Sequence, residues 1–252
     1  MTEMLIISSR TRTQRFLDAV RAESIKLWTL PATWLVTLGT VALTGVLSVA
    51  LAADSGGSTP VDSLDRGVVA ITWTQCGFFL LGVIAATSEY VGGQCRTTLV
   101  AVPDRVVQRL AATMALLGYG CVAALVTVGV SVTSTLIILG VSADTLDLAL
   151  AARIGLSVSG CLALMAVLSS ALGFLLRKAI PAAAILLLYL LVVSPLLQGQ
   201  RWYFLPDMAA YTLWFTRATD GAPPTPVAWL TILGWTLALL VPSILVARRR
   251  DT

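Results

Sequence analysis

The stretch Arg153–Leu197 reads RIGLSVSGCLALMAVLSSALGFLLRKAIPAAAILLLYLLVVSPLL, and it decides the fold class. It contains two uncharged, strongly apolar runs on either side of Arg177-Lys178, and each run is close to the roughly 20 residues that a helix needs to cross a bilayer. A charged side chain at the centre of a membrane helix costs about 2.5–3.5 kcal/mol. We therefore expect the dipeptide in a tight turn at the membrane surface, between two spans.

The same pattern recurs along the whole chain. Of its 252 residues, 57% are hydrophobic and only 12% are charged, and the mean hydropathy is +0.88. Soluble domains carry roughly 25% charged residues. The composition predicts an all-α, polytopic membrane protein in which residues 1–252 form a single transmembrane domain. Six spans are predicted: Ala32–Ala53, Gly67–Thr87, Leu110–Leu139, Arg153–Leu176, Ala179–Leu197 and Val227–Ala247.

The distribution of charge predicts the orientation. Most lysines and arginines fall in the N-terminal segment, in residues 88–109, in Arg177-Lys178 and in the C-terminal tail, which an even number of spans places on one side. Most acidic residues fall in the other connections. Because basic connections stay inside, both termini are predicted to be cytoplasmic. The net charge of +4 then reflects membrane topology, and no nucleic-acid partner is expected.

Two flanking segments have patterns of their own. Residues 11–30 place Phe16, Leu17, Val20, Leu27 and Trp28 on one side of a helix, which is typical of an amphipathic helix in the inner interface. A simple positively charged stop before the first span is the alternative. The connection 198–226 is predicted to be extracellular and is rich in aromatic residues, which favours short interfacial or partly re-entrant helices. An aromatic belt with no substrate role is the plainer interpretation.

Candidate chemistry is sparse. The chain has no histidine, no GxSxG or HExxH motif and no phosphate-binding GxxxxGK[ST] loop, so we predict that it is not an enzyme. Asp62/Asp65 and Asp144/Asp147 are interpreted as solvated loop charges rather than a cation site. The cysteines are interpreted as packing residues, with no metal: Cys76, Cys95, Cys121 and Cys161.

A substrate pathway is predicted around Gln75 in the second span. Gln75 is the most polar inner residue, and intramembrane polar side chains either face a pathway or bind a neighbouring helix, so both roles stay open. The candidate pathway residues are Thr72, Trp73, Gln75, Phe79 and Tyr189. The central parts of the spans lack ionisable residues, which counts against a proton-coupled or ion-coupled transporter.

The segment after the second span is SEYVGGQCRTTLVAVPDRVVQR, Ser88–Arg109. It resembles the first cytoplasmic loop of ABC-2 type transporter permeases, which commonly reads Glu, then Gly, then a basic residue and Leu, then Pro and Arg. Two further segments are similar to that family: RAESIKLWTLPATW (Arg21–Trp34) and YFLPDMAAYTL (Tyr203–Leu213). The short basic break at Arg177-Lys178 is similar as well.

The resemblance implies the membrane subunit of an ATP-binding-cassette exporter in a bacterial cytoplasmic membrane. Such a complex pairs the chain with a second permease, alike or related, and with two copies of a separate ATPase that holds the ATP and Mg, while this chain carries no cofactor. The loop 88–109 would dock on the ATPase through a coupling helix near Val91–Val102. The implied coupling residues are Glu89, Gly92, Gly93, Arg96, Thr97, Leu99, Pro103 and Arg105.

The function implied is export of an amphipathic or apolar substrate (a drug, an antibiotic, a peptide or a lipid), because the predicted spans offer few polar groups. A non-transporting membrane scaffold or sensor component is the alternative. A membrane enzyme acting on lipids is a third hypothesis. It would need clustered acidic residues at the membrane surface, and the spacing of the aspartates does not suggest such a cluster.

Overall fold

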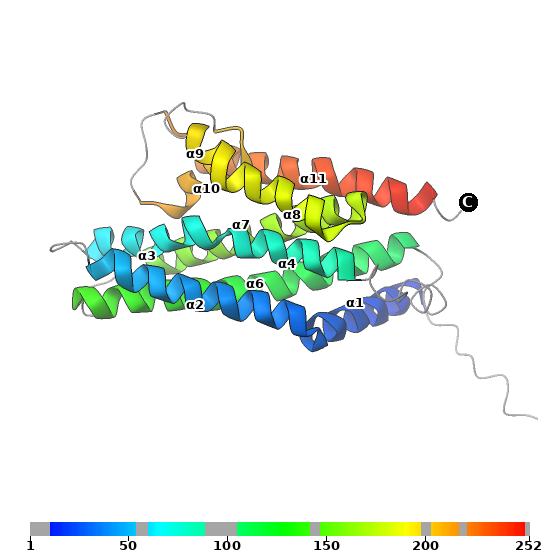
Figure 1. Cartoon of the computed structure of the whole chain (residues 1–252), viewed down its shortest axis with the longest axis horizontal. Helices are drawn as coiled ribbons and strands as arrows, with labels where there is room; N and C mark the ends of the chain where they lie inside the picture. The colour runs from blue at the N-terminus through cyan, green and yellow to red at the C-terminus, as the bar shows by residue number, and fades with distance from the viewer. Residues whose placement is uncertain are drawn as a thin grey trace, which may run out of the picture.

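The computed structural model describes residues 11–53, 60–88, 105–141, 147–197, 203–216 and 221–249. The regular elements in these ranges are all helical and form an elongated bundle, with most helices parallel to its long axis (Figure 1). They are α1 (Arg12–Thr29), α2 (Pro31–Ala53), α3 (Pro60–Thr74), α4 (Cys76–Thr87), α6 (Arg105–Leu139), α7 (Leu148–Leu176), α8 (Ala179–Leu188), the π-helix η3 (Tyr189–Val193), α9 (Ser194–Leu197), α10 (Pro206–Trp214) and α11 (Thr225–Arg249).

Membrane character follows from helix length and composition. Within the described residues, five helical segments are long and apolar enough to cross a bilayer, and the bent pair α3–α4 makes a sixth if it counts as one span. Helices suit this role because each satisfies its own backbone hydrogen bonds where no water can. The prediction of an all-α, multi-pass membrane protein is confirmed at this level of five to six candidate spans.

The second predicted span, Gly67–Thr87, differs most from the structure. The helix begins earlier, at Pro60, and is interrupted at Gln75, where α3 and α4 meet at an angle of 43°. Asp62 and Asp65 therefore lie within helix α3, and their interpretation as loop residues is wrong. The sequence around them is polar, but a helix can extend past the apolar core of the membrane into such a segment.

Two other spans also begin earlier than hydropathy predicts. Helix α6 begins at Arg105 rather than at Leu110, and α7 begins at Leu148. The earlier start of α7 has a local cause, because the Asp147 side chain accepts hydrogen bonds from the N–H groups of Ala149 and Leu150. Such an N-cap residue determines where the helix begins, independently of the hydropathy of the neighbouring residues.

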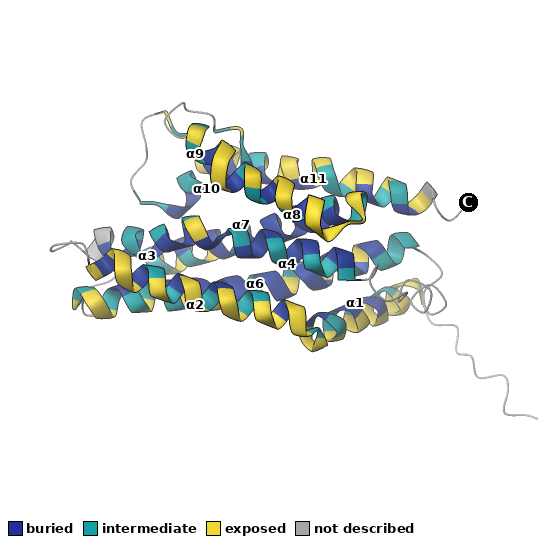
Figure 2. Cartoon of the chain, viewed as in Figure 1, coloured by how far each residue is buried: buried dark blue, intermediate teal, exposed yellow. Residues whose placement is uncertain are grey.

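Helix α7 forms the centre of the bundle. In its most apolar stretch 72% of the residues are buried, against 22% in each of α2, the α8–α9 segment and α11. Figure 2 shows the same contrast, with α7 and α4 mostly dark blue and α2, α8 and α11 largely yellow on the outside. The outer helices expose large apolar side chains such as Leu35, Ile180 and Leu230. Those side chains suit lipid contact.

Small polar residues join α2, α3 and α6. The Thr44 hydroxyl donates to the Thr74 hydroxyl at 2.7 Å, and the Ser48 and Ser131 hydroxyls lie 2.7 Å apart. The Ser131 hydroxyl also bonds the Gly67 carbonyl oxygen. Hydroxyl contacts of this kind stabilise helix association in membranes, where the hydrophobic effect between helices is absent.

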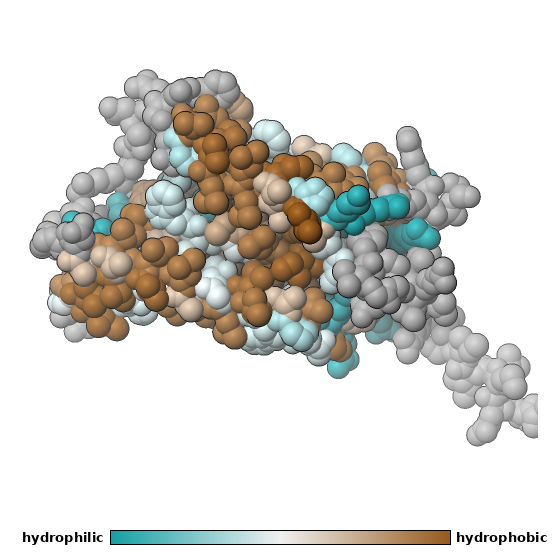
Figure 3. Space-filling view, viewed as in Figure 1, coloured by the Kyte–Doolittle hydropathy of each residue, from teal (hydrophilic) through white to brown (hydrophobic). Residues whose placement is uncertain are grey.

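Most basic residues of the described part of the chain gather at one end of the bundle, which we call the basic end. Helix α6 begins there, the α7–α8 turn and the end of α11 lie there, and α1 packs beside them (Figure 1). The basic end carries Arg105, Arg109, Arg177, Lys178 and Arg248. In Figure 3 brown apolar side chains cover most of the visible face, and teal side chains gather at this right-hand end.

Helix α1 occupies the segment predicted to be amphipathic, and one narrow face of it is buried against the bundle. It packs along α6 through Ala19, Glu23 and Leu27, which are buried at a spacing of four residues. Leu17 and Trp28 of the predicted apolar face are exposed. The contact face is selected by its fit to α6, since small Ala19 allows close approach, while Lys26 pairs with the buried Glu23 carboxylate at 3.5 Å.

Candidate functional site

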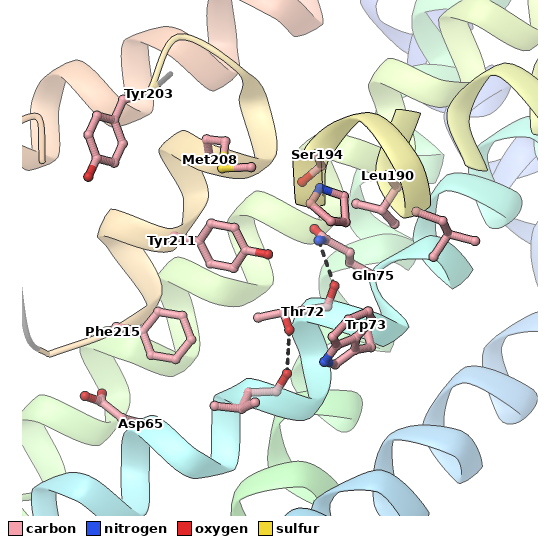
Figure 4. A pocket seen from close by; sticks show the side chains of 13 residues that line it. Asp65, Thr72, Trp73, Gln75, Leu190, Ser194, Tyr203, Met208, Tyr211 and Phe215 are labelled. Atoms are coloured by element: carbon pink, nitrogen blue, oxygen red, sulfur yellow. Dashed lines mark hydrogen bonds between the residues drawn. The ribbon is translucent and has the colours of Figure 1, made fainter. Parts of the chain in front are cut away.

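A pocket of about 500 Å³ opens at the end of the bundle opposite the basic end. It lies between α3, the joint at Gln75 that follows it, the η3–α9 segment and α10 (Figure 4). This volume lies within the range of pockets that bind small molecules. It is lined by Asp65, Val69, Thr72, Trp73, Gln75, Leu190, Leu191, Ser194, Pro195, Tyr203, Met208, Tyr211 and Phe215.

Gln75 forms the inner wall of this pocket and also shapes it. Its side-chain Nε2 donates to the Thr72 carbonyl oxygen at 2.9 Å, in the position where a regular helix would place the Cys76 N–H. A side chain that inserts into the helical hydrogen-bond ladder bends the helix, and the 43° break lies here. The side chain is 1% exposed, and its Oε1 has no hydrogen-bond partner among the described residues.

The opposite wall combines a π-helix with the short helix α10. A π-helix is rare, and short π-segments occur frequently at functional sites. Here Leu190 and Leu191 of η3 line the pocket. The pocket therefore lies between two interrupted helices, α3–α4 and α8–η3–α9.

A buried carboxyl group joins α10 to the η3 wall. Asp207, which is 1% exposed, accepts hydrogen bonds from the Tyr189 and Ser194 hydroxyls on its two oxygens. The connection 198–226, predicted to be interfacial, thus sends α10 into the bundle, where Trp214 is fully buried. Burial of Trp214 differs from the interpretation of these aromatic residues as a surface belt.

Asp65 and aromatic rings form the outer part of the pocket. The Asp65 carboxylate accepts from the Thr216 N–H at 2.8 Å and from the Thr216 hydroxyl at 2.7 Å, so its position is held. Tyr211 and Phe215 stack with ring centroids 6.1 Å apart beside it. Figure 4 shows Asp65 and Gln75 at different ends of the pocket, with Tyr211 and Phe215 along one side.

The predicted pathway residues divide into three groups. Thr72, Trp73 and Gln75 line the pocket, and Trp73 is 57% exposed. Phe79 is buried in the core below it, at 1% exposure. Tyr189 is half-buried and bonds Asp207 behind the pocket wall.

The pocket residues that were not among the predicted pathway residues come from several segments. Asp65, Ser194, Tyr203, Met208, Tyr211 and Phe215 reach the pocket from α3, α9 and the α10 region. The density of aromatic residues in 198–226 was a signal for part of this set. Their convergence with Gln75 depends on how α10 packs.

The basic end holds the second region of interest. Among the predicted coupling residues, Glu89, Gly92, Gly93, Arg96, Thr97, Leu99 and Pro103 lie outside the described residues. Arg105 is half-buried at the first position of α6. Cys95 also lies outside them, while Cys76, Cys121 and Cys161 are free thiols within the apolar helices.

Arg109 ties three helices together at this end. It is 6% exposed, and its guanidinium donates to the Ser170 hydroxyl of α7 at 3.2 Å and to the Ser243 hydroxyl of α11 at 3.4 Å. It also lies 4.8 Å from the centroid of the Phe174 ring. Arg109 therefore links the start of α6 to both α7 and α11.

Replacing Arg109 by alanine is expected to lower the free energy of unfolding by about 2 kcal/mol, through two lost hydrogen bonds and a lost ring contact. The thermal unfolding midpoint in detergent measures this. Arg248→Ala is the matched control, because Arg248 is exposed at the same end, and it should change stability by less than about 0.5 kcal/mol. Equal midpoints for both variants would contradict a structural role for Arg109.

No protein-family model matches this chain, and a comparison with curated proteins finds no match either. The pocket and the arrangement of the helices therefore carry the functional interpretation.

Proposed function

We propose that the chain is the membrane permease subunit of an ATP-driven exporter of the ABC type, embedded in a bacterial cytoplasmic membrane with both termini inside. The observation that carries this proposal is the pocket between two interrupted helices, α3–α4 and α8–η3–α9. Discontinuous helices are typical of transport sites, because the break frees polar groups within the membrane and gives one half of a helix freedom to move.

The proposed coupling runs from the loop 88–109 to the pocket. Residues 88–104 of this segment connect α4 to α6, and residues 105–109 are the first turn of α6, so a force on the segment acts on both helices. Helix α4 meets α3 at Gln75, where the pocket begins, and the helix ladder is weakened there. A tilt of α4 about this joint would widen or close the pocket. Arg109 would carry the accompanying movement of α6 to α7 and α11.

The energy source would be a separate ATPase, present in two copies, with a second permease chain completing the complex. This division follows the resemblance of Ser88–Arg109 to the coupling loop of ABC-2 permeases. The substrate would be an amphipathic or apolar molecule, since apolar and aromatic side chains form most of the pocket wall.

A non-transporting scaffold or sensor is the second candidate. Its helices could have the same arrangement, and it would need no ATPase. The experiment that separates the two is co-purification in mild detergent with ATP-binding subunits of the same host. We expect an ATPase at equal stoichiometry with wild type, and roughly tenfold weaker retention with Glu89→Ala/Arg96→Ala, because losing about 1.4 kcal/mol of interfacial charge contacts weakens binding tenfold.

Arg153→Ala is the matched control for this experiment, because Arg153 is an exposed arginine at the opposite end of the bundle. It should leave ATPase retention unchanged. If wild type purifies without any ATPase, the exporter proposal is wrong and the scaffold is favoured. If both variants lose the ATPase equally, the loop is not the docking site.

A further inference from the structure

We infer that the pocket binds an elongated amphipathic organic cation that carries an N–H donor. This inference rests on the proposed function for its biological meaning, but the binding itself needs no ATPase. It is built on three features of the pocket wall: a buried acceptor that no described donor reaches, a carboxylate that no described lysine or arginine pairs with, and aromatic rings between and around them.

The acceptor is the Gln75 amide oxygen. The orientation of the amide is determined by Nε2, which must be the atom that faces the Thr72 carbonyl oxygen, since two acceptors cannot bond each other. Oε1 is therefore the buried atom without a partner among the described residues. A buried acceptor left unsatisfied destabilises the empty pocket. A ligand N–H that reaches the inner end of the pocket removes this cost.

The anion is Asp65. Thr216 holds both carboxylate oxygens, but it is neutral, and no lysine or arginine within the described part of the chain pairs with Asp65. The described residues that line the pocket include no basic side chain. Among the described lining residues the formal charge is therefore negative, which favours a cation over an anion at the pocket wall.

The aromatic rings give the ligand its apolar surface. Trp73, Tyr203, Tyr211 and Phe215 line the pocket between and around the two polar ends. Aromatic faces attract organic cations, and they bury a flat apolar body at low cost. A delocalised aromatic cation combines a positive charge with a flat apolar body. It therefore fits these rings better than a compact ammonium, which would keep its hydration shell.

The separation of the two polar ends sets the shape of the ligand. Asp65 lies in α3 and Gln75 directly follows its last residue, Thr74, and ten residues of helix span about 15 Å. A ligand that contacts both ends must therefore be elongated. The pocket volume of about 500 Å³ accommodates a molecule of that length if it is flat.

The test uses three xanthene dyes with the same flat core. Rhodamine 6G is a cation with N–H donors, tetramethylrhodamine methyl ester is a cation without them, and fluorescein is an anion. Binding is measured by fluorescence anisotropy with the full chain in phosphatidylcholine nanodiscs, and empty nanodiscs supply the blank. We expect rhodamine 6G to bind wild type about five- to tenfold more tightly than the methyl ester, and fluorescein not to bind.

Two variants assign the contacts. Gln75→Leu should weaken rhodamine 6G about five- to tenfold and leave the methyl ester unchanged, because only the first dye donates to Oε1. Asp65→Asn should weaken both cations equally. Thr133→Val is the control, because Thr133 is exposed on α6 and its hydroxyl bonds only its own helix.

The inference is overturned if fluorescein binds as tightly as rhodamine 6G, or if Gln75→Leu and Asp65→Asn both bind rhodamine 6G like wild type. If Gln75→Leu fails to fold, binding of the three dyes to wild type and to Asp65→Asn still tests the inference. Dye binding without an ATPase in the co-purification would remove the exporter proposal and keep the pocket assignment. An ATPase without dye binding would remove the pocket assignment and keep the exporter proposal.

Discussion

Gly82→Ala is expected to disrupt the contact between α4 and α7 and to lower the free energy of unfolding by about 3 kcal/mol or more. A Cβ atom at Gly82 would lie 1.9 Å from the Ala166 carbonyl oxygen and 2.1 Å from the Ser169 hydroxyl. The first of these is backbone of the central helix, so no side-chain rotation relieves the clash. The two helices would have to separate, and this contact is the most extensive in the bundle.

The measurement is thermal unfolding of the purified chain in detergent, where a loss of this size corresponds to roughly 6–12 °C in the midpoint. Gly118→Ala is the matched control. A Cβ at Gly118 meets nothing within 4 Å, and alanine is about 1 kcal/mol more favourable than glycine inside a helix. The control should therefore be neutral or stabilising. If both variants have the same midpoint, α4 and α7 do not approach each other closely at Gly82.

Asp207→Ala is expected to detach α10 from the η3–α9 wall and to cost about 3 kcal/mol. The substitution leaves the Tyr189 and Ser194 hydroxyls without their acceptor, in a place where Ser194 is 1% exposed. It also loosens Met208 and Tyr211, which α10 contributes to the pocket. Both the unfolding midpoint and the affinity for rhodamine 6G should therefore fall.

A double-mutant cycle with Tyr189→Phe checks that the loss comes from this contact. Tyr189→Phe alone should cost about 1 kcal/mol, and it should cost nothing further once Asp207 is alanine, because the hydroxyl then has no acceptor to lose. Asp207→Asn should lie between wild type and alanine, since one oxygen acceptor remains. Strictly additive losses in the cycle would show that Tyr189 and Asp207 do not interact.

The membrane architecture was predictable because hydropathy is a local property. The run Ala179–Leu197 and the basic break before it could be recognised without knowing any partner helix. The start of α7 at Leu148 and the break at Gln75 could not be recognised in the same way. One depends on an N-cap bond, and the other on a side chain that competes for the Thr72 carbonyl oxygen.

The pocket was only partly predictable for a related reason. Gln75 stood out because a polar amide within an apolar run is conspicuous in the sequence. Asp65 was interpreted as loop charge, and its role depends on Thr216, a residue far away along the chain. Asp207 lies in a polar connection between spans, and nothing in the neighbouring sequence reveals that it is buried against Tyr189.

The sequence by itself determined the helical class, the membrane as solvent and the grouping of basic residues, because each of these follows from side-chain polarity and its spacing along the chain. Tertiary structure alone decided which helix is central, where α10 packs, and which residues enclose the pocket. Those features depend on contacts between distant segments, such as Gly82 with Ala166 and Asp207 with Ser194. Their energies depend on distances of a few ångströms, which local patterns do not encode.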